Sequence, residues 1–215
     1  MANWGIVFIY LDRSELVKVI NSGAIAVAAG STHSLVLKED GSVWAVGYNL
    51  HGQLGNGTTN SKNTFIEVIN SGAIAIAAGV EHSLVLKADG SVWTAGRNGA
   101  GQLNDTDSNR HEFVKVINAG VIAVAAGGYH SLVLKADGSV WAMGINNYGE
   151  LGDGTANSNN TFIEVIDSEV IAIAAGGYNS LAVRVDGSVW TAGDDEYGQL
   201  GINSILYKHF EPVID

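Results

Sequence analysis

Short apolar runs separated by polar turns follow one another along the chain. Residues 24–29 are apolar throughout, residues 34–38 and 42–47 are rich in Val, Leu and Trp, and residues 65–69 alternate apolar and charged side chains. Runs of this length and composition predict β-strands. Because no stretch shows a sustained period of 3.6 residues, we expect few helices.

The same order of runs recurs at intervals of 48 or 49 residues. The Gly-Ser-Val-Trp motif shows these intervals through Trp44, Trp93, Trp141 and Trp190. The repeats occupy residues 24–69, 73–117, 121–166 and 170–214, and an extra copy of the last strand pattern lies at 16–20. We therefore predict a single domain over residues 1–215 that contains four structural repeats.

Each repeat predicts an antiparallel sheet of four strands. Asp40-Gly41 separates the second and third runs and is a strong hairpin signal. Units of this size that pack side by side form a β-propeller, whose sheets are called blades. We expect the Ala-rich first strand to be innermost and buried on both faces, and the Trp after the turn to fill the space between neighbouring blades.

A resemblance to a known family follows from residues 28–58, which read AAGSTHSLVLKEDGSVWAVGYNLHGQLGNGT. This run resembles the regulator of chromosome condensation repeat: a small-residue strand ending in Gly-Gly, then His-Ser-Leu, Asp-Gly-x-Val-Trp and Gly-x-Asn-x-x-Gly-Gln-Leu-Gly. The likeness covers roughly residues 16–214. Two departures are Asn179 in place of the His and Gly-Gln-Leu-Asn-Asp at residues 101–105.

The resemblance implies an all-β propeller that works through protein–protein contacts and needs no cofactor. One family precedent is nucleotide exchange on a Ran-type GTPase with docking to nucleosomes. Another is a secreted bacterial inhibitor of β-lactamases. Family propellers usually have seven blades, whereas this chain supplies four.

The number of repeats leaves two forms of the propeller open. The chain holds four copies of the first three strands and five copies of the fourth. Exposed blade edges favour aggregation, so we expect the ring to close. Four blades could close alone, with a strand from one end of the chain as a clasp. Alternatively, two chains could form an eight-bladed homodimeric ring with two-fold symmetry, which the wide rings of the resembled family favour.

Composition narrows the classes of partner. The 215 residues include 22 acidic and 11 basic side chains, for a net charge of −11. This balance argues against nucleic acid, including the nucleosome precedent, and against anionic membranes. The apolar run within residues 1–13 is too short to span a bilayer. The absence of Cys excludes disulfides and thiolate metal sites and leaves the compartment open between cytoplasmic and secreted.

Several motifs resemble chemical sites but lack an essential part. The glycine-rich residues 47–57 have neither the Lys nor the helix start of a phosphate loop. Asp105, Asp107 and Asn109 have a calcium-like spacing without the required Gly and Glu. No Ser-His-Asp or general acid–base set departs from the repeat. We predict no catalytic residue, no metal site, no cofactor and no enzymatic activity.

Three equivalent histidines are the remaining candidate metal ligands. Three His can bind zinc, but a repeat copies every residue whether or not it is functional. The resemblance instead implies a hydrogen bond that stabilises a turn. The three are His33, His82 and His130.

Strand direction predicts that the variable loops share one face. The turn after each first strand and the loop after each third strand fall on this face, whereas the nearly identical Asp-Gly turns fall on the opposite one. Tyr beside charged groups on a rigid surface is typical of protein-binding hot spots. We predict a partner-binding surface made of Tyr48, Leu50, His51, Glu81, Arg97, Tyr129, Tyr148, Tyr178, Asp194, Asp195, Glu196 and Tyr197.

The sequence thus predicts a non-enzymatic scaffold that binds a partner protein. The alternative, a ligand-binding or lectin-like propeller, requires equivalent polar and aromatic residues in every blade. Tyr48 and Arg97 have no match at their places in the other blades. A nucleotide-exchange factor for a small GTPase is a third interpretation.

Overall fold

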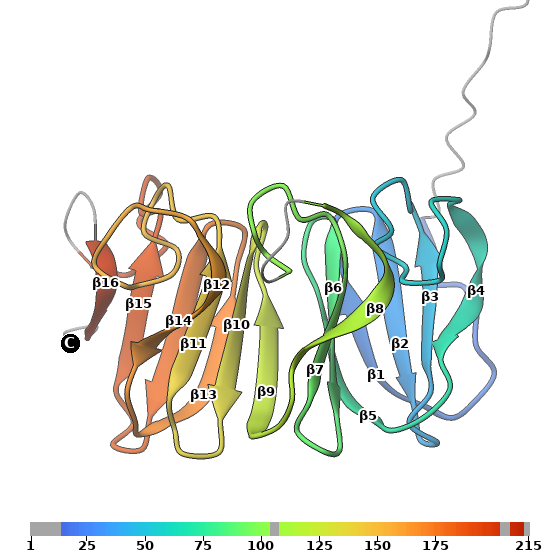
Figure 1. The fold of residues 1–215 in the computed structure, drawn as a ribbon, viewed down its shortest axis with the longest axis horizontal. Helices are drawn as coiled ribbons and strands as arrows, with labels where there is room; N and C mark the ends of the chain where they lie inside the picture. Colours follow the sequence, from blue (N-terminus) through green and yellow to red (C-terminus); the bar gives the residue numbers. More distant parts are fainter. Residues whose placement is uncertain (1–13, 104–107, 203–206, 213–215) are drawn as a thin grey trace, which may run out of the picture.

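A computed structural model of the chain describes residues 14–103 and 108–202, together with the backbone of 207–212. These residues form sixteen β-strands in four antiparallel sheets of four strands (Figure 1). The predicted all-β fold with four-stranded blades is therefore confirmed. In the described part of the chain, no helix has the length and apolarity that a membrane crossing requires.

Each blade contains four consecutive strands, paired in chain order. Blade 1 comprises β1 (Ala24–Ala29), β2 (His33–Lys38), β3 (Val43–Gly47) and β4 (Lys62–Ile69). Blade 2 comprises β5 (Ala73–Ala78), β6 (His82–Lys87), β7 (Val92–Gly96) and β8 (Arg110–Ile117). Blade 3 comprises β9 (Val121–Ala126), β10 (His130–Lys135), β11 (Val140–Gly144) and β12 (Asn159–Ile166). Blade 4 comprises β13 (Val170–Ala175), β14 (Asn179–Arg184), β15 (Val189–Gly193) and β16 (Tyr207–Pro212).

The Asp-Gly signal marks the hairpin between the second and third strand of each blade. In blade 1, the Gly41 amide donates to the Lys38 carbonyl at 2.9 Å, and the Lys38 amide donates to the Ser42 carbonyl at 3.0 Å. Gly41 has a φ of 76°, which closes this three-residue turn and which glycine adopts without strain. The other three blades repeat both bonds.

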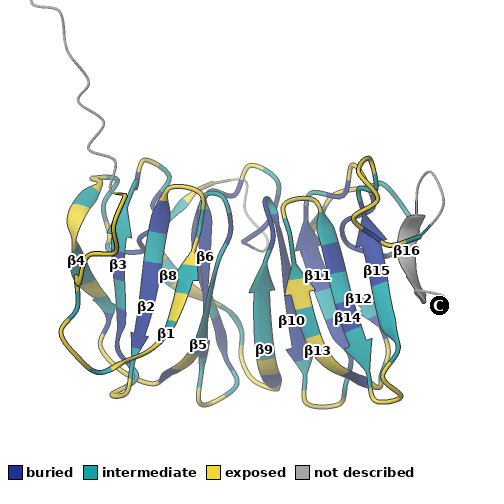
Figure 2. Cartoon of the chain, turned by 180° about the vertical axis from the view of Figure 1, so that it is seen from behind, coloured by how far each residue is buried: buried dark blue, intermediate teal, exposed yellow. Residues whose placement is uncertain are grey.

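The blades form an open arc. The first strands β1, β5, β9 and β13 contact one another in order along its inner side, as predicted for innermost strands. Blade 1 and blade 4 lie at opposite ends of the row (Figures 1 and 2). The described residues therefore do not form a closed four-bladed ring, because the inner strands β1 and β13 at the two ends of the row do not pack against each other as neighbouring inner strands do.

The inner strands differ from the sequence prediction in their burial. One Ile near the start of each inner strand is more than half exposed instead of buried: Ile25, Ile74, Ile122 and Ile171. The pairing with the second strand shifts register at each of these residues. The irregularity removes the Ile from the packed face, which apolar composition alone does not reveal.

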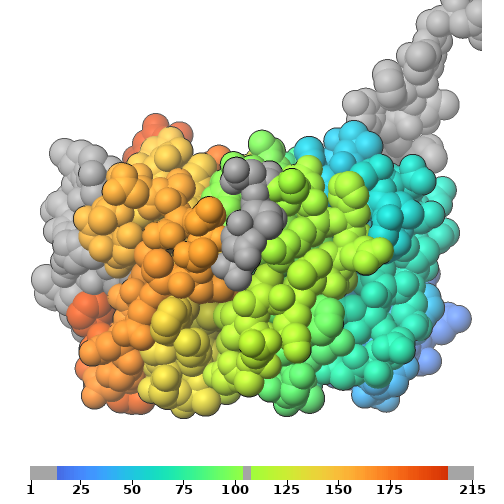
Figure 3. Space-filling model, in the orientation of Figure 1, coloured from blue at the N-terminus to red at the C-terminus, as the bar shows by residue number. Residues whose placement is uncertain are grey.

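The hydrophobic core lies between blades as well as within them. Trp93 of blade 2 packs against a buried cluster that contains Leu37 and Val43 of blade 1, and Trp141 and Trp190 pack against clusters that contain residues of the preceding blade. The predicted placement of Trp between blades is confirmed at these three positions. On the outer side, the Gly57 amide of blade 1 donates to the His111 carbonyl of blade 2 at 2.8 Å, and Figure 3 shows the surfaces of these two blades directly adjoining.

Residues 16–20 do not form the predicted strand. They lead toward β1 without strand pairing, and Leu16, Val17 and Val19 are exposed. The outer edge of β3 in blade 1 is already paired with β4, so the position of the fourth strand is not available to this segment.

Candidate partner-binding face

The variable loops lie together on one face, as the strand directions predict. The Tyr48 amide donates to the Thr32 carbonyl at 2.8 Å, and the Arg97 amide donates to the Glu81 carbonyl at 2.8 Å. Blades 3 and 4 have the same bond between the short turn and the long loop. We call this surface the loop face; it lies at the upper edge in Figure 1, opposite the Asp-Gly turns.

A buried Asn holds the backbone of the long loop in blades 1 to 3. The Asn49 side chain donates through Nδ2 to the Asn56 side chain and to the Thr58 and Asn60 carbonyls at 2.9–3.2 Å. Its Oδ1 accepts from the Leu54 amide at 2.9 Å. Asn98 and Asn146 accept the same amide bond in blades 2 and 3. The loops are thus rigid supports for whatever side chains they carry.

Asp195 takes the place of this Asn in blade 4. Its Oδ1 accepts from the Leu200 amide at 2.9 Å, as Asn49 does from Leu54. The Asp195 carboxylate, which the sequence groups with the binding residues, is therefore engaged in holding its own loop. The repeat alignment gave a signal for this role, because Asn49, Asn98 and Asn146 occupy the matching position.

Five of the predicted residues form a charged and aromatic cluster across blades 1 to 3. Arg97 Nη1 lies 2.7 Å from Glu81 Oε2, and His51 Nε2 lies 3.4 Å from Glu81 Oε1. The Arg97 guanidinium stands 5.4 Å from the centroid of the Tyr129 ring, and the Tyr48 ring meets the His51 ring edge-on. The hydrogen bond that Arg97 donates to the Glu81 carboxylate raises the pKa of Arg97, so this side chain presents a fixed positive charge.

A second group joins blades 3 and 4. The rings of Tyr148 and Tyr178 pack edge to face with centroids 5.6 Å apart, and both remain exposed. Edge-to-face packing of this kind stabilises the position of both rings. The pair offers a preorganised aromatic surface beside the cluster.

The remaining predicted residues stand apart. Leu50 is exposed at the tip of the blade 1 loop. In blade 4, Asp194 is engaged locally, because its Oδ1 accepts from the Glu196 amide at 3.2 Å. Tyr197 is 85% exposed, the highest value for any described Tyr. The structure thus brings seven of the twelve residues into two contact groups.

The three equivalent histidines connect neighbouring blades. His33 Nε2 lies 2.8 Å from Ser83 Oγ of blade 2, and Ser83 donates its single hydroxyl hydrogen to the Gln53 carbonyl at 2.7 Å. The ring nitrogen must therefore be the donor to Ser83. His82–Ser131 and His130–Ser180 repeat the arrangement at 3.1 and 3.0 Å. The predicted turn-stabilising role is wrong, because the bond crosses to the next blade.

These histidines are neutral structural groups. Burial lowers the pKa of His33 and His130 to about 4 and that of His82 to about 3. Within the described residues, no three His, Cys, Asp or Glu side chains are grouped closely enough to hold a metal ion. Asp105 and Asp107, considered for calcium, lie outside the described residues.

Glu150 is a buried acid that the sequence analysis missed. It replaces the Gln found in the other three loops, accepts from the Tyr148 amide at 2.9 Å through Oε2, and leaves the buried Oε1 without a partner. Burial raises the pKa of Glu150. The signal was the single Gly-Glu-Leu-Gly among Gly-Gln-Leu motifs.

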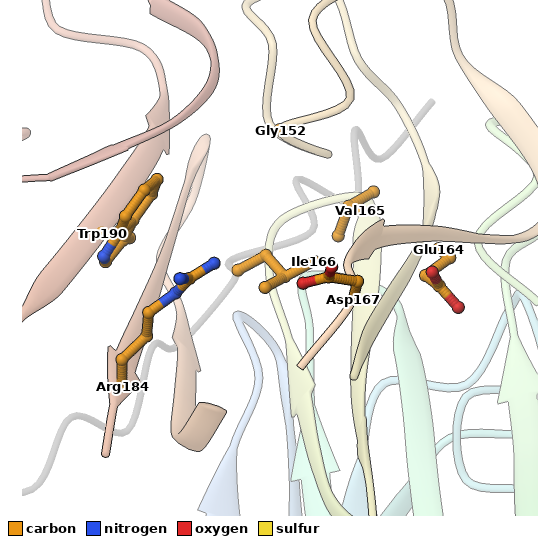
Figure 4. Close-up of a pocket in the computed structure, with 7 residues that line it drawn as sticks. All are labelled: Gly152, Glu164, Val165, Ile166, Asp167, Arg184 and Trp190. Carbon is orange, nitrogen blue, oxygen red and sulfur yellow. The ribbon is translucent and has the colours of Figure 1, made fainter. Parts of the chain in front are cut away.

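Grooves on the outer side separate neighbouring blades. One, of about 340 Å³, lies between β12 and blade 4 and is lined by Glu164, Asp167, Arg184 and Trp190 among others (Figure 4). An equivalent groove between blades 1 and 2 contains Glu67, Lys87 and Trp93. The grooves recur with the repeat, so they follow from the architecture.

Each Trp beside the Asp-Gly turns already has partners from its own blade. The Trp93 indole donates to Ser91 Oγ at 3.0 Å, and the other three Trp do the same. A Lys or Arg of the same blade stands 3.5–4.4 Å from the ring centroid in all four cases. These contacts cover one face of the ring and occupy its only donor.

Comparison with solved structures supports the architecture. Human WBSCR16 superposes with a TM-score of 0.81 at 25% identity, covering 90% of this chain and 54% of that one. Yeast RCC1 (Prp20), solved bound to Kap60, gives a TM-score of 0.80 at 22% identity, covering 89% and 49%. The chain thus spans about half the length of these solved structures.

Sequence comparison gives the family. A 41-residue segment is 49% identical to the E3 ubiquitin-protein ligase MYCBP2 of Danio rerio, covering 19% of this chain and 1% of that protein. The family model described as RCC1-like domain matches residues 11–213. This match extends over nearly the whole chain and agrees with the repeat motifs and the blade geometry. The chain therefore belongs to the RCC1-like domain family.

Proposed function

We propose that the chain is a non-enzymatic scaffold that binds a partner protein through the loop face. The observation that carries the proposal is the pairing of variable side chains at every blade boundary of the arc. Boundary 1–2 has His51 beside Glu81, boundary 2–3 has Arg97 beside Tyr129, and boundary 3–4 has a tyrosine pair. Rigid loops that present Arg and Tyr match the composition of protein-binding hot spots.

Relatives of similar fold bind proteins. Yeast RCC1 (Prp20) has been solved with Kap60, and a second structure of Prp20p from Saccharomyces cerevisiae is described together with its binding to Gsp1p and histones. For this chain, the net charge of −11 and the exposed Glu196 favour a partner with a basic patch.

The lectin-like alternative has less support. A lectin-like propeller would use equivalent polar and aromatic residues in every blade. Here the four repeated Trp rings each carry a Lys or Arg of their own blade. The loop face, in contrast, has a different residue set at every boundary, as expected for one protein partner.

Comparative affinity capture tests the proposal. The wild-type chain, used as bait, is compared with a loop-face variant, Arg97→Ala/Tyr178→Ala, and with a turn-face control, Glu39→Ala/Val185→Ala, whose two residues are both exposed. We expect a protein that the wild type and the control retain and the loop-face variant loses at least tenfold. Equal capture by all three baits, or recovery of glycans alone, would overturn the proposal. Accelerated nucleotide release from a captured GTPase would show an exchange factor instead of a scaffold.

A further inference from the structure

Each joint between neighbouring blades has two complementary halves. The leading half, on the earlier blade, supplies the His ring, a loop carbonyl and the glycine of the Asp-Gly turn. The receiving half, on the later blade, supplies a Ser hydroxyl and the amide that begins the inner strand. At the middle joint these are His82 to Ser131, Ser131 to the Gln102 carbonyl at 3.0 Å, and the Val121 amide to the Gly90 carbonyl at 3.2 Å.

Blade 1 carries a receiving half that none of the described residues of the arc occupies. Its Ser34 is the counterpart of Ser83, and Ala24 is the counterpart of Ala73, whose amide donates to Gly41. Val27 is 77% exposed, although the matching Ile76 packs against the core of the preceding blade. The exposed Leu16 and Val19 precede this surface in the chain.

Blade 4 carries a leading half that, among the described residues, is likewise unoccupied. A Cβ on the turn glycines Gly41 and Gly90 would lie 2.7 Å from the backbone of the next blade, whereas one on Gly187 would meet nothing within 4 Å. Gly198 likewise meets nothing, although the matching Gly52 is buried against blade 2. Tyr197, at the rim of this half, is the most exposed described Tyr.

Asn179 keeps the chemistry that the joint requires. In the inner joints the side chain at this position must donate to Ser, because the Ser hydrogen goes to a carbonyl. The Asn amide supplies such a donor, which an acidic or apolar residue would not. Asn179 also lies over Gly176 as the His rings lie over their glycines.

We propose that the leading half of blade 4 binds the receiving half of blade 1 in a second copy of the chain. The joint pairs Asn179 with Ser34 of that copy. The two halves lie at opposite ends of one arc, so they meet only between copies. Two such joints close a two-fold ring of eight blades. A second copy is the favoured occupant because these surfaces continue an interface that already occurs three times within the chain.

Light scattering with a glycine pair of variants tests the proposal. We expect a mass of about 45 kDa, twice the 22.4 kDa of the chain. Gly187→Ala places a Cβ in the joint and is expected to raise the dimer dissociation constant at least tenfold. The control Gly72→Ala has the same positive φ (82° against 85°) and also meets nothing within 4 Å, and it should remain dimeric.

A second variant keeps the proposal falsifiable if Gly187→Ala folds poorly. Asn179→His restores the repeat residue and is expected to strengthen the dimer several-fold. A wild-type mass of 22.4 kDa at micromolar concentrations, a mass that grows without limit, or a dimer indifferent to both Gly187→Ala and Asn179→His would overturn the two-copy ring. Because capture through the loop face is measured with separate variants, failure here leaves the proposed function testable.

Discussion

Each blade boundary has two parts: a buried joint, made by the His–Ser hydrogen bonds, and an exposed rim, made by the side-chain pairs of the loop face. The residues of the joint are nearly the same at all three boundaries, whereas those of the rim differ from one boundary to the next. The buried joint has the same His–Ser–carbonyl chain three times, with His-to-Ser distances of 2.8–3.1 Å. The rim has a His–Glu pair at the first boundary, an Arg over a Tyr at the second and two packed Tyr at the third. Both sets come from the same repeat.

The joint residues vary less than the rim residues because the joint residues are buried and each needs a hydrogen-bond partner. A buried donor or acceptor that loses its partner costs about 1–3 kcal/mol, so each joint residue is fixed by the others. On the rim, His51, Arg97 and Tyr148 stand on long loops whose backbone is already held by a buried Asn. Replacement of such a side chain disturbs little of the fold, and the rim can therefore specialise toward a partner.

Acid is expected to produce the largest effect, because it attacks all three joints together. The folded-state pKa values of about 4, 3 and 4 lie below the ordinary 6.5, so the stability from neutral His is fully present above pH 6.5 and is lost as the pH falls toward these values. Each His should lower the free energy of unfolding by about 1.4 kcal/mol per pH unit. Denaturant titrations between pH 7 and 4.5 measure this slope.

His82→Asn is the matched control for the acid effect, since the chain itself uses Asn at position 179. The variant keeps a donor for Ser131 but cannot take up a proton. Its stability should depend on pH about one third less than that of the wild type. An unchanged slope would show that carboxylates, not the joints, control acid unfolding.

The second-largest effect is expected from a substitution that tests whether the joint depends on close approach of the two backbones. Gly90 has a φ of 76°, and a Cβ there would lie 2.7 Å from the Gly120 nitrogen of blade 3. Gly90→Ala should lower the free energy of unfolding by about 2–4 kcal/mol, from backbone strain together with the clash. Gly72→Ala, with φ of 82° and open space, should cost only about 1 kcal/mol. Equal losses in thermal or denaturant unfolding would mean that the joint does not depend on close approach.

A smaller effect of opposite sign is expected at Glu150. Its pKa is raised by burial, so its favourable protonated form is present at low pH and is lost as the pH rises. Glu150→Gln, which installs the residue of the other loops, should increase the stability at pH 7 by on the order of 1 kcal/mol. The gain should shrink at pH 4. A loss of stability at pH 7 would indicate that the unpartnered Oε1 has a role of its own.

The rim should give the smallest change in stability. The Arg97 side chain is 43% exposed, and exposed ion pairs contribute about 0–1 kcal/mol. A double-mutant cycle of Arg97→Ala and Glu81→Ala should therefore yield a coupling energy below about 1 kcal/mol. A coupling above 2 kcal/mol would place these residues in the scaffold rather than in a free binding surface.

The repeat predicted the strands of each blade and the Trp packing between blades, but not the hydrogen bonds between blades or the shape of the row of blades. Four strands per repeat, the Asp-Gly turns and the Trp between blades all follow from local patterns and repeat spacing. The His-to-Ser bond joins residues one repeat apart, so it depends on the direction in which blades pack, which no single motif contains. The open arc depends similarly on the rotation between sheets.

The sequence predicted where the candidate binding residues lie better than it predicted which contacts they make. Loop variability selected Glu81, Arg97 and Tyr129, which the structure brings together. It also selected Asp195, whose carboxylate holds its loop. Sequence variation alone does not distinguish a residue that changed for a partner from one that retained a structural hydrogen bond in a new form.

Hydrogen exchange of the chain with and without its captured partner tests the central claim most directly. The account predicts new protection in the rim loops 48–51, 80–81, 97–100 and 145–148, with unchanged exchange at the Asp-Gly turns on the opposite face. Protection concentrated at those turns, residues 39–41, 88–90 and 136–138, would contradict it.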